Sequence, residues 1–115
     1  MEFTWDFIRM FFMGLLYAAP LLATLAFIIV ILGHVLGRLE GWSGADAMYH
    51  AFITATTVGY GDFCPRQKRS KVLAVAIAFV GIVFTGIIVA IALHSASHAF
   101  EKTHDVAKIV EKVAE

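Results

Sequence analysis

The chain has 115 residues, of which 60% are hydrophobic and 16% are charged, with a mean hydropathy of +0.81. This balance excludes an ordinary soluble domain. Nine basic and nine acidic residues give a formal net charge of zero, and the dispersed basic residues argue against nucleic acid as a partner.

Two long apolar intervals dominate the chain. No charged residue stands between Arg9 and Arg38, or between Lys71 and Glu101. Each interval exceeds the roughly 20 apolar residues that cross a bilayer core. The sequence therefore predicts an all-α membrane protein with two transmembrane helices. The length leaves no room for a separate soluble domain beyond a short tail.

The N-terminal residues 1–10 mix aromatic and charged side chains, a pattern that predicts a helix lying in the membrane interface. A cleaved signal peptide is rejected because this start is acidic and the apolar run that follows is too long. The first span is expected at residues 11–36, with Pro20 freeing one backbone carbonyl. Gly33 and Gly37, four residues apart, favour close helix packing.

A short helix is predicted at residues 45–56, after the Gly-Trp-Ser-Gly break that begins at Gly41. Ser43 or Asp46 is the expected N-cap. At 1.5 Å per residue this helix is roughly 18 Å long, too short to cross a bilayer, so we expect it to be re-entrant. Its carbonyl end, closed by Thr56, is electronegative and would favour a cation inside the membrane.

The segment 56–62 reads Thr-Thr-Val-Gly-Tyr-Gly-Asp and lies between the two spans. A bare potassium ion must replace its water shell with oxygens, and a ring of backbone carbonyls supplies them without a fixed charge. Successive carbonyls face one axis only if the backbone alternates between left- and right-handed regions. Gly59 and Gly61 enter the left-handed region at little steric cost, and Val58 and Tyr60 take the conformations between them.

The ends of this segment add polar groups. The Thr57 hydroxyl can supply one more oxygen at the inner end, and the Asp62 carboxylate would concentrate cations at the outer end. Asp62 as a simple turn residue is the alternative. One chain carries one such strand and four are needed to surround an ion, so we expect a homotetramer with cyclic symmetry.

Thr57 to Gly61 resemble the selectivity filter of potassium channels, and the order of elements resembles their two-helix pore module over nearly the whole chain. The resemblance implies potassium sites at Thr57, Val58, Gly59 and Tyr60. It also implies a multi-pass protein of the cell membrane with both termini cytoplasmic. Tyr49 aligns with a tryptophan that supports the filter aspartate in many members, and Ile53 stands where some members hold a buried glutamate.

The second span is expected at residues 72–97. Gly81 lies twenty residues beyond Gly61, the spacing of the family's hinge glycine, and packing against a neighbour is the alternative. Thr85 is expected to line the cavity or to touch a neighbouring helix. The amphipathic tail, 101–115, predicts either a short cytoplasmic four-helix bundle or a frayed end.

His94 and His98 are one helical turn apart near the inner mouth. Protonation of a ring of such histidines would add repulsion, which makes them a candidate pH sensor. A weak transition-metal site and plain interfacial histidines are the alternatives.

The sequence thus predicts a passive potassium-selective channel gated by its inner helices, divided into residues 1–10, a pore domain at 11–100 and the tail. The alternatives are a weakly selective cation channel and a non-conducting assembly subunit. No nucleophile–base pair or phosphate loop supports an enzyme, and no organic cofactor is expected. Expected partners are three further copies and membrane lipids, with a cytoplasmic regulatory domain if the chain is an excised pore.

Overall fold

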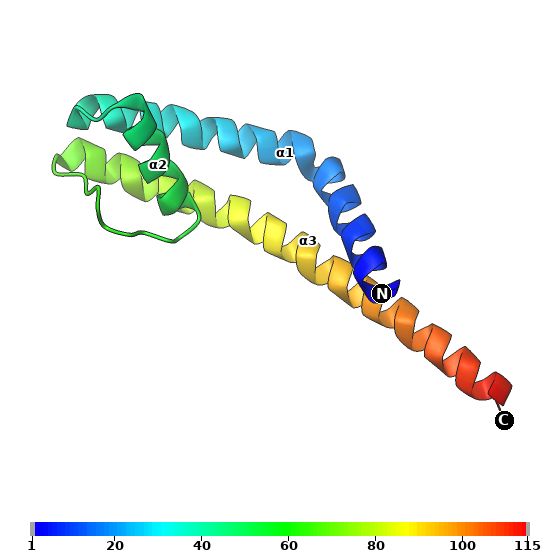
Figure 1. Cartoon of the computed structure of the whole chain (residues 1–115). Helices are drawn as coiled ribbons and strands as arrows, with labels where there is room; N and C mark the ends of the chain where they lie inside the picture. The colour runs from blue at the N-terminus through cyan, green and yellow to red at the C-terminus, as the bar shows by residue number, and fades with distance from the viewer. Residues whose placement is uncertain (1, 115) are drawn as a thin grey trace. The chain divides into compact units, whose positions relative to one another are not determined.

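The computed structural model describes residues 2–114, which form three helices (Figure 1). These are α1 (Glu2–Glu40), α2 (Gly44–Ala55) and α3 (Lys68–Ala114). Within the described residues, α1 and α3 are long and apolar enough to cross a membrane and α2 is not. The two long helices confirm the prediction of two spans in an all-α protein.

Helices α1 and α3 are longer than the predicted spans because nothing interrupts them. Residues 2–10 are the first turns of α1 instead of a separate interfacial helix, since no glycine or proline precedes Gly14. Pro20 lies inside α1, and the Thr24 hydroxyl donates to the Pro20 carbonyl at 2.8 Å. The tail likewise continues α3 to Ala114 with no break after residue 97.

Helix α2 begins with the predicted cap. Ser43 has extended backbone, and its hydroxyl accepts the Asp46 backbone N–H at 3.2 Å. The Asp46 carboxylate in the first turn also complements the positive end of the helix dipole. The helix spans Gly44–Ala55, one residue earlier than the predicted 45–56.

The chain divides into two compact units, and the larger runs from Pro20 to Ile87. In this unit α2 lies between the cyan part of α1 and the yellow-green part of α3 (Figure 1). Its buried core takes residues from all three helices: Ile29, Leu36, Ala51, Ala55 and Ile77.

Two glycines of α1 let α2 approach closely. A Cβ at Gly33 would lie 2.7 Å from the Ala51 side chain, and one at Gly37 would meet the Ala47 side chain. Both glycines are buried, as are both alanines. The predicted close packing at these two glycines is therefore confirmed, and its partner is α2.

The second unit comprises the chain up to Ala19 together with the chain from Ile88 onward. Here Gly14 accommodates the Ile91 side chain, since a Cβ at Gly14 would lie 2.6 Å from it. Ser95 and Ala99 are almost completely buried on one face of α3. A turn further, Lys102 pairs with Asp6 at 3.3 Å.

Candidate functional site

The segment after α2 is anchored by its own N–H groups. Thr56 N–H donates to the Phe52 carbonyl at 2.9 Å, and the Thr56 hydroxyl reaches the same oxygen at 2.7 Å. The N–H groups of Val58 and Gly59 both donate to the Ile53 carbonyl, at 2.9 and 3.1 Å. These bonds use the carbonyls that the end of α2 leaves free. The helix end therefore positions the start of the candidate filter.

Alternate residues of this segment have left-handed backbone. The φ angles are +65° at Thr57, +54° at Gly59 and +82° at Gly61. Both glycines take the conformation expected from the sequence. Thr57 also takes it, although a β-branched residue is a clear outlier there. A left-handed residue at every second position gives the alternation that turns successive carbonyls the same way.

The carbonyl oxygens of Thr57, Val58, Gly59 and Tyr60 accept no hydrogen bond from any residue between 2 and 114. The Gly61 carbonyl accepts one from the Cys64 thiol at 3.3 Å. In the single chain Val58 is 51% exposed and Tyr60 71% exposed. The segment thus offers a row of carbonyl oxygens without hydrogen-bond donors. Within a single chain the other described residues leave its side chains largely uncovered.

Four rings form an aromatic cluster beside the segment. The Trp42 ring centroid lies 5.0 Å from that of His50 and 5.3 Å from that of Phe63, all at edge-to-face angles. Tyr49 meets Phe63 at 6.1 Å. Such pairs contribute about 0.5–1.5 kcal/mol beyond burial. The cluster joins the residues before α2, α2 itself and the irregular segment that follows Asp62.

Asp62 lies beside two members of the aromatic cluster. Burial raises the pKa of the Tyr49 phenol, and the nearby Asp62 carboxylate raises it further. Burial lowers the pKa of His50, and the same carboxylate opposes this change. His50 is 5% exposed; its Nε2 lies 3.4 Å from the Thr54 hydroxyl, and its Nδ1 has no partner among the described residues.

Helix α3 contacts the end of α2 through two residues. A Cβ at Gly81 would overlap the backbone of Ala55. One turn later, the Thr85 hydroxyl donates to the Ala55 carbonyl at 3.3 Å. Gly81 therefore has the packing contact that was the alternative to a hinge, and Thr85 touches α2. By contrast, a Cβ at Gly86 would meet nothing within 4 Å.

Glu40 closes the loop between α2 and α3. Its carboxylate accepts the backbone N–H groups of Arg66 at 2.8 Å and Gln67 at 3.0 Å, just before α3 begins. The Gln67 side chain returns a bond to the Leu39 carbonyl at 2.7 Å. The Gln67 hydrogen bond is the main cause that lowers the pKa of Glu40. The end of α1 thereby caps the start of α3.

The two predicted histidines of α3 lie outside this site. Both are exposed, and His98 lines a cavity of about 150 Å³ with Asp6, Arg9 and Lys102. Among residues 2–114 no group of three His, Cys, Asp or Glu side chains is placed to hold a metal ion.

Sequence reasoning missed Glu40 and the joint role of Trp42, His50 and Phe63. One signal was present, since aromatic residues flank the candidate filter on both sides at positions 42, 49 and 63. Nothing local in the sequence pairs Glu40 with residues 66 and 67. That contact depends on how the loop folds back to the end of α1.

Comparison with known proteins gives a consistent picture. Residues 21–97 match a family model described as an ion channel, Ion_trans_2. The two pore potassium channel b of Oryza sativa subsp. japonica is 40% identical over 72 residues, which is 63% of this chain and 20% of that protein. Potassium channel protein 1 of Methanocaldococcus jannaschii is 36% identical over 55 residues, 48% of this chain and 16% of that protein.

A third relative, two-pore potassium channel 1 of Arabidopsis thaliana, is 49% identical over 41 residues, 36% of this chain and 11% of that protein. The chain thus spans a fifth or less of the length of these three relatives. No solved structure matches it.

Proposed function

This chain belongs to the ion-channel family whose model covers residues 21–97, as a two-helix potassium channel pore module, and from that membership we propose that it conducts potassium passively through a selective, carbonyl-lined filter. It is a channel and not an enzyme.

The observation that carries the proposal is the alternation of left-handed backbone at Thr57, Gly59 and Gly61. It directly follows a helix whose terminal carbonyls hold the segment's N–H groups. Carbonyls that take no protein donor are then available to replace the water shell of a dehydrated ion. We assign potassium sites to Thr57, Val58, Gly59 and Tyr60, with the Gly61 backbone closing the row.

Support for the filter comes from Thr56, Tyr49 and Asp62. The Thr56 hydroxyl secures the end of α2, and Tyr49 and Asp62 hold the outer end of the strand close to the aromatic cluster. The Asp62 carboxylate would also raise the local concentration of cations.

Four copies are proposed because one chain contributes one strand. The exposed side chains of Val58 and Tyr60 and the many exposed apolar residues of α1 and α3 agree with surfaces that copies and lipid would cover. In the tetramer α2 would be re-entrant, with its carbonyl end facing a central cavity. Both termini are proposed to be cytoplasmic and the filter to open outward in the cell membrane.

Gating is assigned to α3. A glycine inside a helix costs roughly 1 kcal/mol relative to alanine and makes bending easier. Gly81 and Gly86 are the two candidates in α3, and only Gly81 is packed against α2 in the single chain. His94 and His98 remain candidates for a pH response at the inner end.

Liposome flux and electrophysiology test the proposal. Purified protein in liposomes is expected to take up rubidium, and reversal potentials in planar bilayers should favour potassium over sodium. Equal permeability to the two ions would indicate a weakly selective cation channel. A tetrameric sample without flux would indicate a non-conducting assembly subunit.

A further inference from the structure

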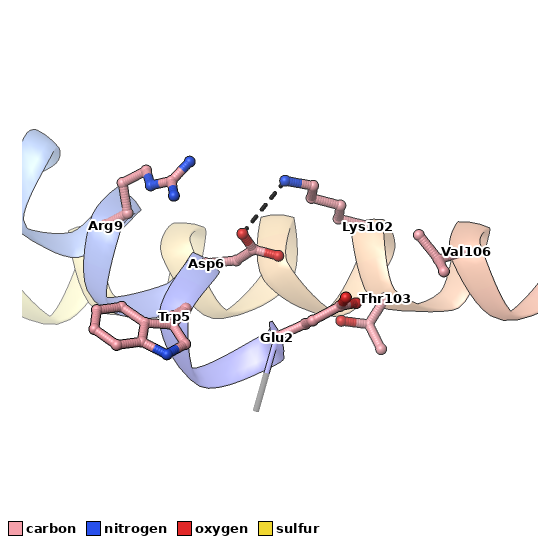
Figure 2. Close-up of a pocket in the computed structure, with 7 residues that line it drawn as sticks. All are labelled: Glu2, Trp5, Asp6, Arg9, Lys102, Thr103 and Val106. Carbon is pink, nitrogen blue, oxygen red and sulfur yellow. Dashed lines mark hydrogen bonds and ion pairs between the residues drawn. The ribbon is translucent and has the colours of Figure 1, made fainter.

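A cavity of about 370 Å³ lies between the first turns of α1 and the last turns of α3 (Figure 2). Its lining includes Glu2, Trp5, Asp6, Arg9 and Lys102. This volume falls within the ~300–1,000 Å³ usual for small-ligand sites. The channel function proposed above uses none of these residues.

The cavity lies at the level where both helices leave the apolar region. Arg9 is the last charged residue before the first uncharged interval, and Lys102 comes directly after Glu101, which ends the second. Trp5 is 65% exposed, and tryptophan is enriched at membrane–water boundaries. A ligand in this cavity would therefore meet the headgroup layer of the bilayer.

The lining of the cavity carries two basic and two acidic side chains. Figure 2 shows Asp6 between Arg9 and Lys102, with its ion pair to Lys102 drawn. Arg9 has no ion-pair partner among residues 2–114, so its planar guanidinium can bind a phosphate through two bonds. Glu2 points toward Thr103, away from the Trp5 ring, so its carboxylate alone is available to an amine (Figure 2).

The charge balance selects among headgroups. Two acidic and two basic side chains line the cavity, so a ligand with one positive and one negative charge leaves no excess. Asp6 opposes a purely anionic headgroup placed between the two bases. A primary ammonium can donate hydrogen bonds to Glu2, whereas a quaternary ammonium has no N–H to donate.

We propose that this cavity binds the phosphoethanolamine headgroup of a zwitterionic phospholipid, with the phosphate on Arg9 and the ammonium at Glu2. The bound headgroup would join the start of α1 to the end of α3 beside the Asp6–Lys102 pair. This assignment needs a membrane location but does not depend on ion selectivity.

Native mass spectrometry of the purified full chain tests the site, with phosphatidylethanolamine, phosphatidylcholine and phosphatidylglycerol added at equal concentration. The wild type is expected to retain phosphatidylethanolamine best. Arg9→Gln should lower its retention about tenfold, the loss of one charge-assisted interaction. The retention by Arg9→Lys should lie between that of the wild type and that of Arg9→Gln, because lysine keeps the charge but cannot form two parallel hydrogen bonds to the phosphate. Glu2→Gln should reduce the preference for ethanolamine over glycerol headgroups to about one.

Arg38→Gln is the matched control, because Arg38 lines another cavity of about 370 Å³ with only His34 as a polar neighbour. It should retain phosphatidylethanolamine as the wild type does. Soluble phosphoethanolamine that displaced the lipid at low concentration would support the same chemistry and identify a free metabolite as a second source.

The proposal is overturned if the wild type shows no preference among the three lipids, or if folded Arg9→Gln and Glu2→Gln proteins retain phosphatidylethanolamine unchanged. Size-exclusion profiles identify the folded variants. Because the readout is bound lipid and not ion flux, a protein that binds the lipid but is silent in liposomes would contradict only the channel proposal.

Discussion

Thr57 combines a β-branched side chain with a left-handed backbone at φ +65°. Such a conformation costs about 1–3 kcal/mol and persists only where its surroundings enforce it. The Thr57 N–H donates to the Thr54 carbonyl at 3.2 Å, and the next two N–H groups share the Ile53 carbonyl. The end of α2 thus holds the strain at the position proposed as the inner end of the filter.

The two glycines that follow were predictable, and Thr57 was not. Gly59 and Gly61 lack a Cβ, so the left-handed backbone that they adopt is open to them at little steric cost. A threonine in the same conformation is disfavoured locally, so only the hydrogen bonds from the end of α2 account for it.

Gly59→Ala tests whether the left-handed backbone is required. A Cβ at φ +54° costs about 1–2 kcal/mol in each chain, and we expect rubidium flux to fall at least about tenfold. Gly44→Ala is the control, because Gly44 lies in α2 with open space around it and an ordinary φ. Flux from Gly59→Ala equal to that from Gly44→Ala would refute the proposed carbonyl row.

At the scale of elements, α2 is held by close backbone contacts on two sides. On one side, Gly33 and Gly37 of α1 pack against Ala51 and Ala47. On the other, Gly81 of α3 packs against Ala55. The sequence indicated small residues at these places but not their partners. In particular, the spacing that suggested a hinge at Gly81 is equally explained by its contact with α2.

Gly81→Ala and Gly86→Ala separate packing from bending. At Gly81 the new methyl group meets the Ala55 backbone, so we expect the protein to lose about 1–3 kcal/mol of stability. At Gly86 it meets nothing within 4 Å, and the helix should gain roughly 1 kcal/mol.

Thermal unfolding and single-channel open probability distinguish the two variants. If α3 bends at Gly86, Gly86→Ala should lower open probability without lowering the unfolding temperature. A Gly81→Ala protein as stable as the wild type would show that the contact with Ala55 is not tight in the assembled channel.

The lowered pKa of Glu40 predicts how the free energy of unfolding depends on pH. Its pKa lies below the ordinary value of 4.5, mainly because of the Gln67 N–H. A lowered folded-state pKa means that the stabilisation is complete above the unfolded-state value and is lost as pH falls through the folded-state value. Glu40→Gln should therefore lower the unfolding temperature at neutral pH and flatten its decline in acid.

Melting curves between pH 3 and pH 8 measure this effect, with Glu111→Gln as the control because Glu111 is exposed near the end of α3. A Glu40→Gln curve parallel to that of the wild type would mean that the loop contact contributes no pH dependence.

At the scale of the whole molecule, a single chain leaves most of its apolar surface uncovered. In the apolar stretch of α1 only 6% of the residues are buried, and in that of α3 only 11% are buried. Lipid can cover such surfaces but cannot complete a filter. The proposed ion sites require equivalent strands from further copies.

Cys64 can report whether copies lie side by side, because it is exposed, is the chain's single cysteine and lies 3.3 Å from the Gly61 carbonyl. A short bifunctional thiol reagent can join neighbouring copies only in pairs, while native mass measurement should give four chains of 12.6 kDa. Cys64→Ser should abolish the cross-link and keep the mass. A wild-type particle of two chains would contradict the fourfold pore.

The sequence by itself determined the two apolar helices, the Ser43 cap and the left-handed glycines, since each depends on residues adjacent in the chain or one helical turn apart. The tertiary structure decided the contact between Gly81 and Ala55, the aromatic cluster and the loop closure by Glu40. These contacts join residues 8 to 27 positions apart, and the local sequence does not specify which distant residues will meet. The strained backbone of Thr57 lies between these groups: the hydrogen bonds that hold it come from residues three to six positions back in the chain, yet its own β-branched side chain disfavours the conformation.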